Sequence, residues 1–493
     1  MIILDGTSLT CADVAALGRR QAAARIGEAG HDRAAAAART MRALTDQAVA
    51  AGVAIYGRTT GVGFNRTIQV SPDDERLVGL RLVRSHAAGA GPLLAPEISL
   101  AMLAVRANQI AAGGSGIDPG VLPVLGDCLA GGFRPPARSY GAIGTGDLTA
   151  LASTALCLLG ERDWLVPEPG QVAPGGQLHF ALDPADMLAF MSSNAATLAE
   201  AAIACCDLTS LLRASTVIAA LGHLAVRASA EPYAEAVQQA RPHPGQIRVA
   251  RDLRELLAAE TGTAARVQDP YSYRALPQVH GTAVEAAAQA EQTIALELNS
   301  ASENPLIDVA GQRILHNGNF HTAYLAHALD GVRAAVIQTG TLSVARLGAL
   351  LDDRVSGLPT FLAADTPPSS GLMMVEYAAH SALADIRRLA GPVVLSGAVL
   401  SVGAEEHAGF GTQAAWSATQ TVRAYRVVLA CELVAAVRAM RLRGERPAGA
   451  ALAQVFGQAD RELPASVADR PVDDDLEIAE QLLAAFAGAC PSA

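Results

Sequence analysis

Four short segments of the sequence place polar side chains beside glycines, a pattern typical of ordered, irregular loops. They are Tyr56–Gly63 (Tyr-Gly-Arg-Thr-Thr-Gly-Val-Gly), Gly141–Leu148 (Gly-Ala-Ile-Gly-Thr-Gly-Asp-Leu), Gln268–Arg274 (Gln-Asp-Pro-Tyr-Ser-Tyr-Arg, followed by Pro277-Gln278) and Ala404–His407 (Ala-Glu-Glu-His). Each segment is a candidate for part of a functional site, and each also has a plain structural explanation.

Taken singly, these segments do not establish a function. A tyrosine in a glycine-rich loop is more often a packed side chain than a base. The run Gly141–Gly146 lacks the lysine of a phosphate-binding loop, so a tight turn into a helix N-terminus is the alternative. The alternative for Gln268–Arg274 is a hydrogen-bonded loop with a purely structural role. Glu406 and His407 are adjacent rather than spaced along one helix face, and no His-Glu-x-x-His motif occurs, which argues against a metal site.

Composition excludes several classes of protein. The net charge is −11 and the basic residues are scattered, whereas nucleic-acid binding needs a dense basic patch. The seven cysteines form no Cys-x-x-Cys pair, and the first residues show no basic segment followed by an apolar run. The longest uncharged apolar stretch, Leu389–Ala404, is too short to span a membrane and predicts a buried core helix. We expect a cytoplasmic protein that binds neither nucleic acid nor membrane.

The elements that must position these loops are mainly helices. Half of the residues are apolar, with alanine and leucine abundant and aromatic residues only 4%, and both alanine and leucine are strong helix formers. The pattern predicts long helices over 278–302, 319–351, 370–402 and 412–442. We therefore expect a mainly α fold, a bundle of long antiparallel helices with a loop-rich N-terminal part. Residues 1–200 would carry the tyrosine loop and Gly144-Thr145-Gly146, and residues 201–493 the central long-helix bundle and the C-terminal helices.

Considered together and in order, the segments resemble one family, that of the histidine and phenylalanine ammonia-lyases and related aminomutases. Gln268–Arg274 is similar to the family's Gln-Asp-Pro-Tyr-Ser-x-Arg signature, and the tyrosine loop to its Tyr-Gly-x-Asn-Thr-Gly-Phe-Gly. The resemblance covers about residues 1–445, and further matches are Arg84–Gly89, Glu297–Asn299, Glu303–Leu306, Gly318–His321, Gly357–Pro359 and Glu405–His407. It implies an ammonia-lyase or fumarase-like helical fold, a small amino-acid-like substrate, and a homotetramer with shared active sites.

The resemblance also implies how the chemistry works. In the family, an Ala-Ser-Gly tripeptide cyclises and loses water to give methylideneimidazolone, an electrophile made from the backbone that needs no external cofactor and no metal. Tyr56 would remove the β-proton, although a free tyrosine has a pKa of about 10 and needs a positive environment to act near neutrality. Arg274 would bind the substrate carboxylate through its bidentate fork. Tyr271 and Gln268 would lie near the electrophile and the amine, Phe320 would pack against the electrophile, and Asn304 would help to hold the carboxylate.

Substrate preference in the family follows the positions of Ser85-His86 and Glu405. Members acting on phenylalanine carry apolar or aromatic residues at the first pair and glutamine at the later position. The polar pair and the carboxylate here resemble the histidine-specific members, because a carboxylate is a natural partner for an imidazole. The alternative is that His86 and Glu405 bond to each other.

The sequence departs from the family around the electrophile. Thr145 replaces the serine of the tripeptide, Gly144 replaces its alanine, and Gly146 is retained. Dehydration of threonine would give an ethylidene whose methyl group hinders addition. Ser192 stands where the family has an asparagine thought to assist electrophile formation, and Asn194, two residues further on, is a candidate substitute.

Three hypotheses remain. The first is an ammonia-lyase or aminomutase acting on histidine or a similar polar or aromatic amino acid, with an electrophile formed at Gly144-Thr145-Gly146. The second is a lyase-like enzyme of specialised metabolism that performs a different elimination, addition or cyclisation without this group. The third is an inert homologue.

Overall fold

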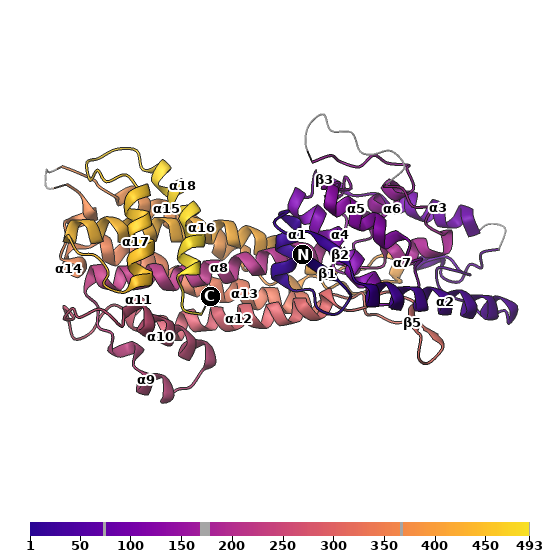
Figure 1. Cartoon of the computed structure of the whole chain (residues 1–493), viewed down its shortest axis with the longest axis horizontal. Helices are drawn as coiled ribbons and strands as arrows, with labels where there is room; N and C mark the ends of the chain where they lie inside the picture. The colour runs from indigo at the N-terminus through magenta and orange to yellow at the C-terminus, as the bar shows by residue number, and fades with distance from the viewer. Residues whose placement is uncertain (72–74, 168–177, 365–367, 493) are drawn as a thin grey trace. The chain divides into compact units, whose positions relative to one another are not determined.

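The computed structural model describes residues 1–493 except 72–74, 168–177, 365–367 and 493 (Figure 1). The described part is mostly helical, and the strands in it form three two-stranded sheets. The predicted mainly α class is therefore confirmed. Residue contacts divide the chain into two compact units, which are described separately. The predicted boundary at residue 200 remains a prediction.

Unit 1 comprises Met1–Cys206, Glu291–Leu329 and Pro392–Trp416. Its helices are α1 (Cys11–Gly18), α2 (Glu28–Ala50), α3 (Glu75–His86), α4 (Pro96–Ala111), α5 (Val121–Gly131), α6 (Leu148–Leu158) and α7 (Met187–Met191). Its short 3-10 turns are η1 (Gly63–Asn65), η2 (Pro184–Asp186), η5 (Val393–Leu395) and η6 (Ser401–Gly403). Strand β1 (Ile2–Leu4) pairs in parallel with β2 (Ala24–Ile26), and two antiparallel pairs follow, β3 (Ala90–Leu93) with β4 (Arg138–Tyr140) and β5 (Leu306–Asp308) with β6 (Arg313–Leu315).

Helix α4 forms the centre of unit 1. Every residue from Ile98 to Ala111 is buried, and the helix packs against α1, α2 and α5. Its one buried cation, Arg106, donates to Glu303 Oε1 at 2.8 Å and to the carbonyl oxygens of Ala189 and Phe190. A buried charge is tolerated only when it is paired and hydrogen-bonded. Arg106 thus ties the core to the segments that carry Asn304 and Ser192.

Unit 2 comprises Asp207–Ala290, Asp330–Gly391 and Ser417–Ala493. It contains α9 (Glu235–Gln239), α10 (Pro244–Leu257), α11 (Tyr271–Arg274), α14 (Asp353–Ser356), α15 (Met373–Leu389), α17 (Ala450–Glu462), α18 (Asp473–Gly488) and the turns η3 (Glu231–Tyr233) and η4 (Thr360–Leu362). Four long helices contribute residues to both units: α8 (Ala195–Val226), α12 (Leu276–Leu298), α13 (Ala323–Leu351) and α16 (Gly411–Arg443). In the core of unit 2, Arg346 binds Glu432 through two hydrogen bonds of 2.6 and 2.9 Å.

One predicted long helix is wrong. The helix expected over 370–402 is α15, which ends at Leu389, and the following chain forms only the 3-10 turns η5 and η6. Pro392 lacks a backbone N–H and restricts the residue before it, so the helix does not continue. The predicted buried core helix at Leu389–Ala404 is wrong for the same reason, and Leu395 and Val402 are 81% and 84% exposed.

Two segments, Pro184–Val226 and Ala323–Leu351, are long and apolar enough to span a membrane by length and composition alone. In their most apolar windows, 78% and 56% of the residues are buried inside the protein. Core helices of soluble proteins meet the same criterion, so these segments are weak evidence for a membrane protein.

Candidate active site

The tyrosine loop curls around the phenol of Tyr56. The backbone N–H of Gly63 donates to Tyr56 Oη at 2.9 Å, which brings the two ends of the loop together. At its start, the N–H of Tyr56 donates to Nε2 of His316, just after β6, at 3.2 Å. Thr59, which replaces the family's asparagine, accepts a hydrogen bond from Ile55 N at 2.8 Å. The hydrogen bond from Gly63 N therefore holds the Tyr56 hydroxyl against the other end of its loop.

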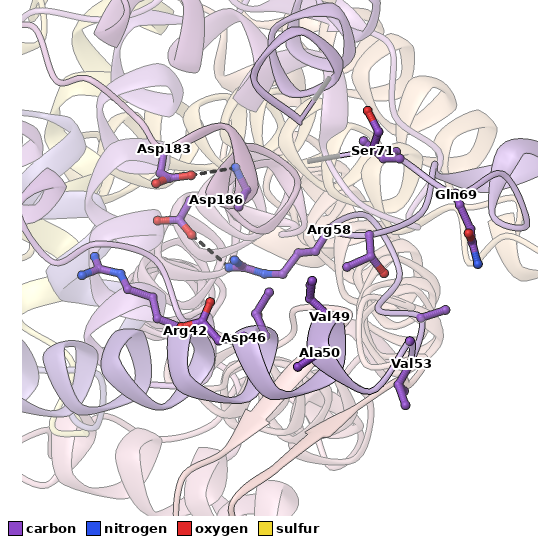
Figure 2. A pocket seen from close by; sticks show the side chains of 16 residues that line it. Arg42, Asp46, Val49, Ala50, Val53, Arg58, Gln69, Ser71, Asp183 and Asp186 are labelled. Atoms are coloured by element: carbon purple, nitrogen blue, oxygen red, sulfur yellow. Dashed lines mark hydrogen bonds and ion pairs between the residues drawn. The ribbon is translucent and has the colours of Figure 1, made fainter. Parts of the chain in front are cut away.

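A buried ion pair between Arg58 and Asp186 anchors the tyrosine loop to the turn η2. Arg58 Nη2 lies 2.9 Å from Asp186 Oδ1, and both side chains are almost fully buried. Arg58 and Asp186 line a cavity of about 660 Å³, whose lining also includes Arg42 and Asp46 of α2 (Figure 2). Burial raises the pKa of Asp186, while Arg58 and the backbone N–H of Asp118 oppose the rise. Removing either partner would leave the other charge buried without compensation.

The Gly144-Thr145-Gly146 segment is held by hydrogen bonds to its backbone. Gly144 O accepts two, from Thr322 N at 3.0 Å and from Thr322 Oγ1 at 2.8 Å. On the other side, Gly146 N donates to Asn194 Oδ1 at 2.9 Å. Next to the tripeptide, Ile143 O accepts from Phe410 N at 2.7 Å. The carbonyl of the first residue and the amide of the third, the two groups that ring closure would join, are both engaged.

The backbone conformation explains why glycine replaces alanine at position 144. Gly144 has φ +86° and Gly146 has φ +107°, a region that residues with a Cβ adopt only under strain. A Cβ on Gly144 would also collide with Thr322 Oγ1, and would lie 2.6 Å from Gly411 N and 2.8 Å from Phe410 N. The segment therefore fits glycine and not the family's alanine.

Asp147 connects the tripeptide to helix α8. It stands at the start of α6, and its carboxylate accepts from Thr197 N and Thr197 Oγ1, both at 2.7 Å. Burial of the carboxylate raises the pKa of Asp147 to about 6, although these bonds lower it. Its own N–H donates to Ser193 O at 2.7 Å.

Three predicted site residues lie on the segments that surround the tripeptide. Ser192 Oγ accepts from Asn304 N at 3.3 Å, and Asn304 Oδ1 accepts from Asn317 N at 3.0 Å. Asn194 Nδ2 donates to the carbonyl oxygen of Phe320 at 2.7 Å. Asn194 thus bridges Gly146 and Phe320, whereas Ser192 binds the backbone of Asn304.

The segment that carries Glu405 lies against the tyrosine loop. Leu400 and Glu405 exchange backbone hydrogen bonds, and Ser401 Oγ accepts from Phe64 N at 3.0 Å. Glu405 Oε1 is 3.8 Å from the position of a Cβ built on Gly63, the residue that binds Tyr56 Oη. The side chain of Glu405 is exposed in the single chain.

Two histidines meet beside this segment. His321 Nε2 and His407 Nδ1 are 2.9 Å apart, and Ala323 N donates to His321 Nδ1 at 3.2 Å. Because His321 Nδ1 accepts, its Nε2 carries the proton and donates to His407. Burial and then the neighbouring His407 lower the pKa of His321.

The predicted selectivity pair closes helix α3. Nδ1 of His86 lies 2.9 Å from Leu82 O and 3.1 Å from Ser85 Oγ. Within the described residues, no hydrogen bond joins His86 to Glu405. The imidazole is therefore held by its own helix.

The remaining predicted residues belong to unit 2. Asp269 anchors their loop by accepting from Arg266 Nη1 at 2.7 Å and from Ser229 N at 2.6 Å. The guanidinium of Arg274 stacks on the ring of Tyr271, with Cζ 4.6 Å from the ring centroid. Tyr271 is 69% exposed, and Gln268 is exposed too. Arg274 Nε is buried and has no hydrogen-bond partner among the described residues.

The structure adds one residue to those predicted. The buried Thr322, which precedes α13, binds Gly144 O with both of its donors. The sequence gives no direct signal for this contact, since Thr322 and Gly144 are 178 residues apart.

Comparison with known proteins agrees with the resemblance seen in the sequence. Residues 9–461 match the aromatic amino acid lyase family. The chain is 34% identical to histidine ammonia-lyase of Geobacillus thermodenitrificans, over 98% of this chain and 97% of the relative. It is 33% identical to histidine ammonia-lyase of Streptomyces coelicolor, over 98% and 96%.

Solved structures with the same fold act on different molecules. Histidine ammonia-lyase from Trypanosoma cruzi aligns with a TM-score of 0.88 at 28% identity, over 99% of this chain and 97% of that one. Tyrosine aminomutase from Streptomyces globisporus gives 0.90 at 28%, over 99% and 98%. Ergothionase from Treponema denticola, an ergothioneine-degrading enzyme, gives 0.88 at 25%, over 98% of both chains. The predicted enzyme class, a carbon–nitrogen lyase or related aminomutase, is confirmed. The chain belongs to the aromatic amino acid lyase family.

Proposed function

We propose that the protein eliminates or moves the amino group of histidine or a similar polar or aromatic amino acid, using an electrophile that forms from Gly144-Thr145-Gly146. The observation that carries this proposal is the pair of contacts on the tripeptide. Two donors bind Gly144 O, and Asn194 Oδ1 accepts from Gly146 N. These contacts fit ring closure, because one polarises the carbonyl that is attacked and the other orients the amide that attacks. When formed, the group would accept the substrate and make its amine a leaving group.

The residues of this chain supply the remaining steps. Tyr56 takes the β-proton onto Oη, an oxygen that already accepts a hydrogen bond from Gly63 N. The Gly63 N–H holds this oxygen in a fixed position within the loop. Arg274 binds the substrate carboxylate, with Asn304 assisting, while Tyr271 and Gln268 contact the amine. Phe320, whose carbonyl Asn194 holds, packs beside the electrophile.

Substrate choice rests on Glu405, near the tyrosine loop, and on Ser85 and His86 at the end of α3. Glu405 lies beside Gly63, and its carboxylate suits an imidazole N–H. Ser85 and His86 present hydrogen-bonding groups rather than an apolar wall. The similarity to histidine ammonia-lyases supports histidine or a close analogue as the substrate.

We also propose a cytoplasmic homotetramer whose subunits share active sites. Exposed apolar side chains support assembly: Leu395, Val399 and Val402 are 81%, 70% and 84% exposed in the single chain. Clustered apolar groups of this kind mark interfaces. The number four rests on the family resemblance.

Intact-mass measurement tests the electrophile directly. The expected result is a mass lower than that of the sequence by two water molecules, together with an ultraviolet difference band absent after Gly146→Pro, which removes the attacking N–H. Tyr56→Phe should keep the mass change and abolish turnover of histidine, while Tyr140→Phe, an exposed control in β4, should keep both. An unmodified wild-type mass would overturn the proposal.

A second candidate is a lyase-like elimination without the electrophile. Thr145 favours it, because the ethylidene formed from threonine hinders addition. Here the mass is unmodified, yet Tyr56→Phe still abolishes turnover.

A further inference from the structure

The hydroxyl of Thr322 is enclosed by three glycines. A Cβ built on Gly144, Gly409 or Gly411 would lie no more than 3.0 Å from Thr322 Oγ1. Thr322 itself is 1% exposed. No side chain larger than hydrogen fits at these three positions without moving the hydroxyl. The socket therefore holds Thr322 Oγ1 in one place.

In this position the hydroxyl of Thr322 lies against the carbonyl oxygen of Gly144. Thr322 Oγ1 donates to it at 2.8 Å and Thr322 N donates to the same atom at 3.0 Å. At a helix N-terminus a threonine hydroxyl usually accepts from the helix's own N–H groups. Here the proton of the hydroxyl points away from α13, toward another segment. The positive end of the α13 dipole faces the same oxygen.

We propose that Thr322 is a positioning residue for ring closure. Its hydroxyl and its backbone N–H both donate to the carbonyl oxygen of Gly144 and polarise that carbonyl. This inference rests on the proposed electrophile and identifies what prepares the tripeptide to form it. Glycine at position 144 is then required for this contact, because the methyl group of the family's alanine would displace the Thr322 hydroxyl.

The chemistry that Thr322 assists is a double dehydration. Gly146 N bonds to the carbonyl carbon of Gly144, and negative charge develops on Gly144 O, where both donors stabilise it. This oxygen leaves as water with the amide protons of Thr145 and Gly146. The Thr145 hydroxyl leaves as a second water with the Cα proton of Thr145. No oxidant or reductant is needed. Loss of one donor to a developing oxyanion slows a reaction about 10²- to 10³-fold.

Time-resolved intact mass tests the role of the hydroxyl. Full-length protein is expressed in a short pulse, translation is stopped, and the loss of two waters is followed in the wild type, Thr322→Ser and Thr322→Val. Thr322→Ser keeps the hydroxyl and should lose the waters at a rate close to that of the wild type. Thr322→Val keeps the shape and should be slower by about 10²-fold. Equal melting temperatures and elution volumes separate this effect from misfolding, and Thr322→Ala replaces Thr322→Val if the latter does not fold.

The outcomes distinguish the two proposals. Loss of water from Thr322→Val at the wild-type rate, or equal slowing of Thr322→Ser, overturns the role of Thr322 and leaves the electrophile intact. Full mass in the wild type overturns the electrophile in this chain, and the same comparison is then made in Thr145→Ser, where the family's serine is restored. Full mass in both backgrounds overturns both proposals.

Discussion

Restoring the family's alanine at position 144 should damage the protein rather than improve it. Gly144→Ala places a Cβ at φ +86°, which costs about 1–2 kcal/mol for a left-handed non-glycine residue. The same Cβ lies 2.6 Å from Gly411 N and 2.8 Å from Phe410 N, besides its collision with Thr322 Oγ1. Overpacking of this kind costs typically about 1–3 kcal/mol. We expect a total loss of about 2–5 kcal/mol of stability.

Urea and thermal unfolding at matched protein concentration measure this loss. Gly126→Ala is the control, because Gly126 lies inside α5 and a Cβ there would meet no atom within 4 Å. Alanine should stabilise that helix by up to about 1 kcal/mol. Gly144→Ala with Thr322→Ala should recover only part of the loss, since the two backbone nitrogens stay in place. A Gly144→Ala protein as stable as the wild type would refute the steric reasoning.

Three further predictions concern the surroundings of the site and the core. Arg58→Met should cost about 3–5 kcal/mol by leaving Asp186 buried and unpaired, and adding Asp186→Leu should recover much of it, as followed by urea unfolding. Burial lowers the pKa of His280 to about 4 from 6.5. As the pH falls, this histidine therefore binds a proton in the unfolded chain before it does so in the folded protein. The free energy of unfolding should decrease between about pH 6.5 and pH 4, by up to roughly 3 kcal/mol. His280→Gln should reduce this acid slope in pH-dependent unfolding, to which the buried His223 also contributes, whereas His243→Gln, at an exposed site, should leave it unchanged. Asn194→Ala removes the acceptor of a tripeptide N–H and should slow the loss of two waters, read by intact mass.

The sequence predicted most of what depends on local composition. Alanine- and leucine-rich stretches became α12, α13 and α16 close to the expected bounds. The prediction of a buried helix after Leu389 was wrong, because apolar composition predicts that a segment is buried but does not identify the surface that covers it. Pro392 ends the helix, and Leu395 and Val402 remain exposed in the single chain.

The contacts of the tripeptide were beyond sequence reasoning for a different reason. Whether Ser192 or Asn194 faces Gly146 depends on how the chain turns after α7, and a two-residue offset cannot be settled from spacing. Thr322 Oγ1 reaches Gly144 O only because α13 begins there. Contacts across such separations are set by the fold, while local propensity decides only the element.

The departures from the family are linked through these contacts, and this bears on the inert-homologue hypothesis. Loss of the methyl group at Gly144 makes the room that the Thr322 hydroxyl occupies. Asn194 accepts from the amide of Gly146, so an asparagine lies against the tripeptide, although the sequence resemblance assigned the family's asparagine position to Ser192. Two donors bind Gly144 O and a buried acceptor binds Gly146 N, an arrangement that suits the proposed ring closure. The contacts of the tripeptide are compatible with the proposed electrophile, and Thr145 is the substitution that would alter the product of ring closure.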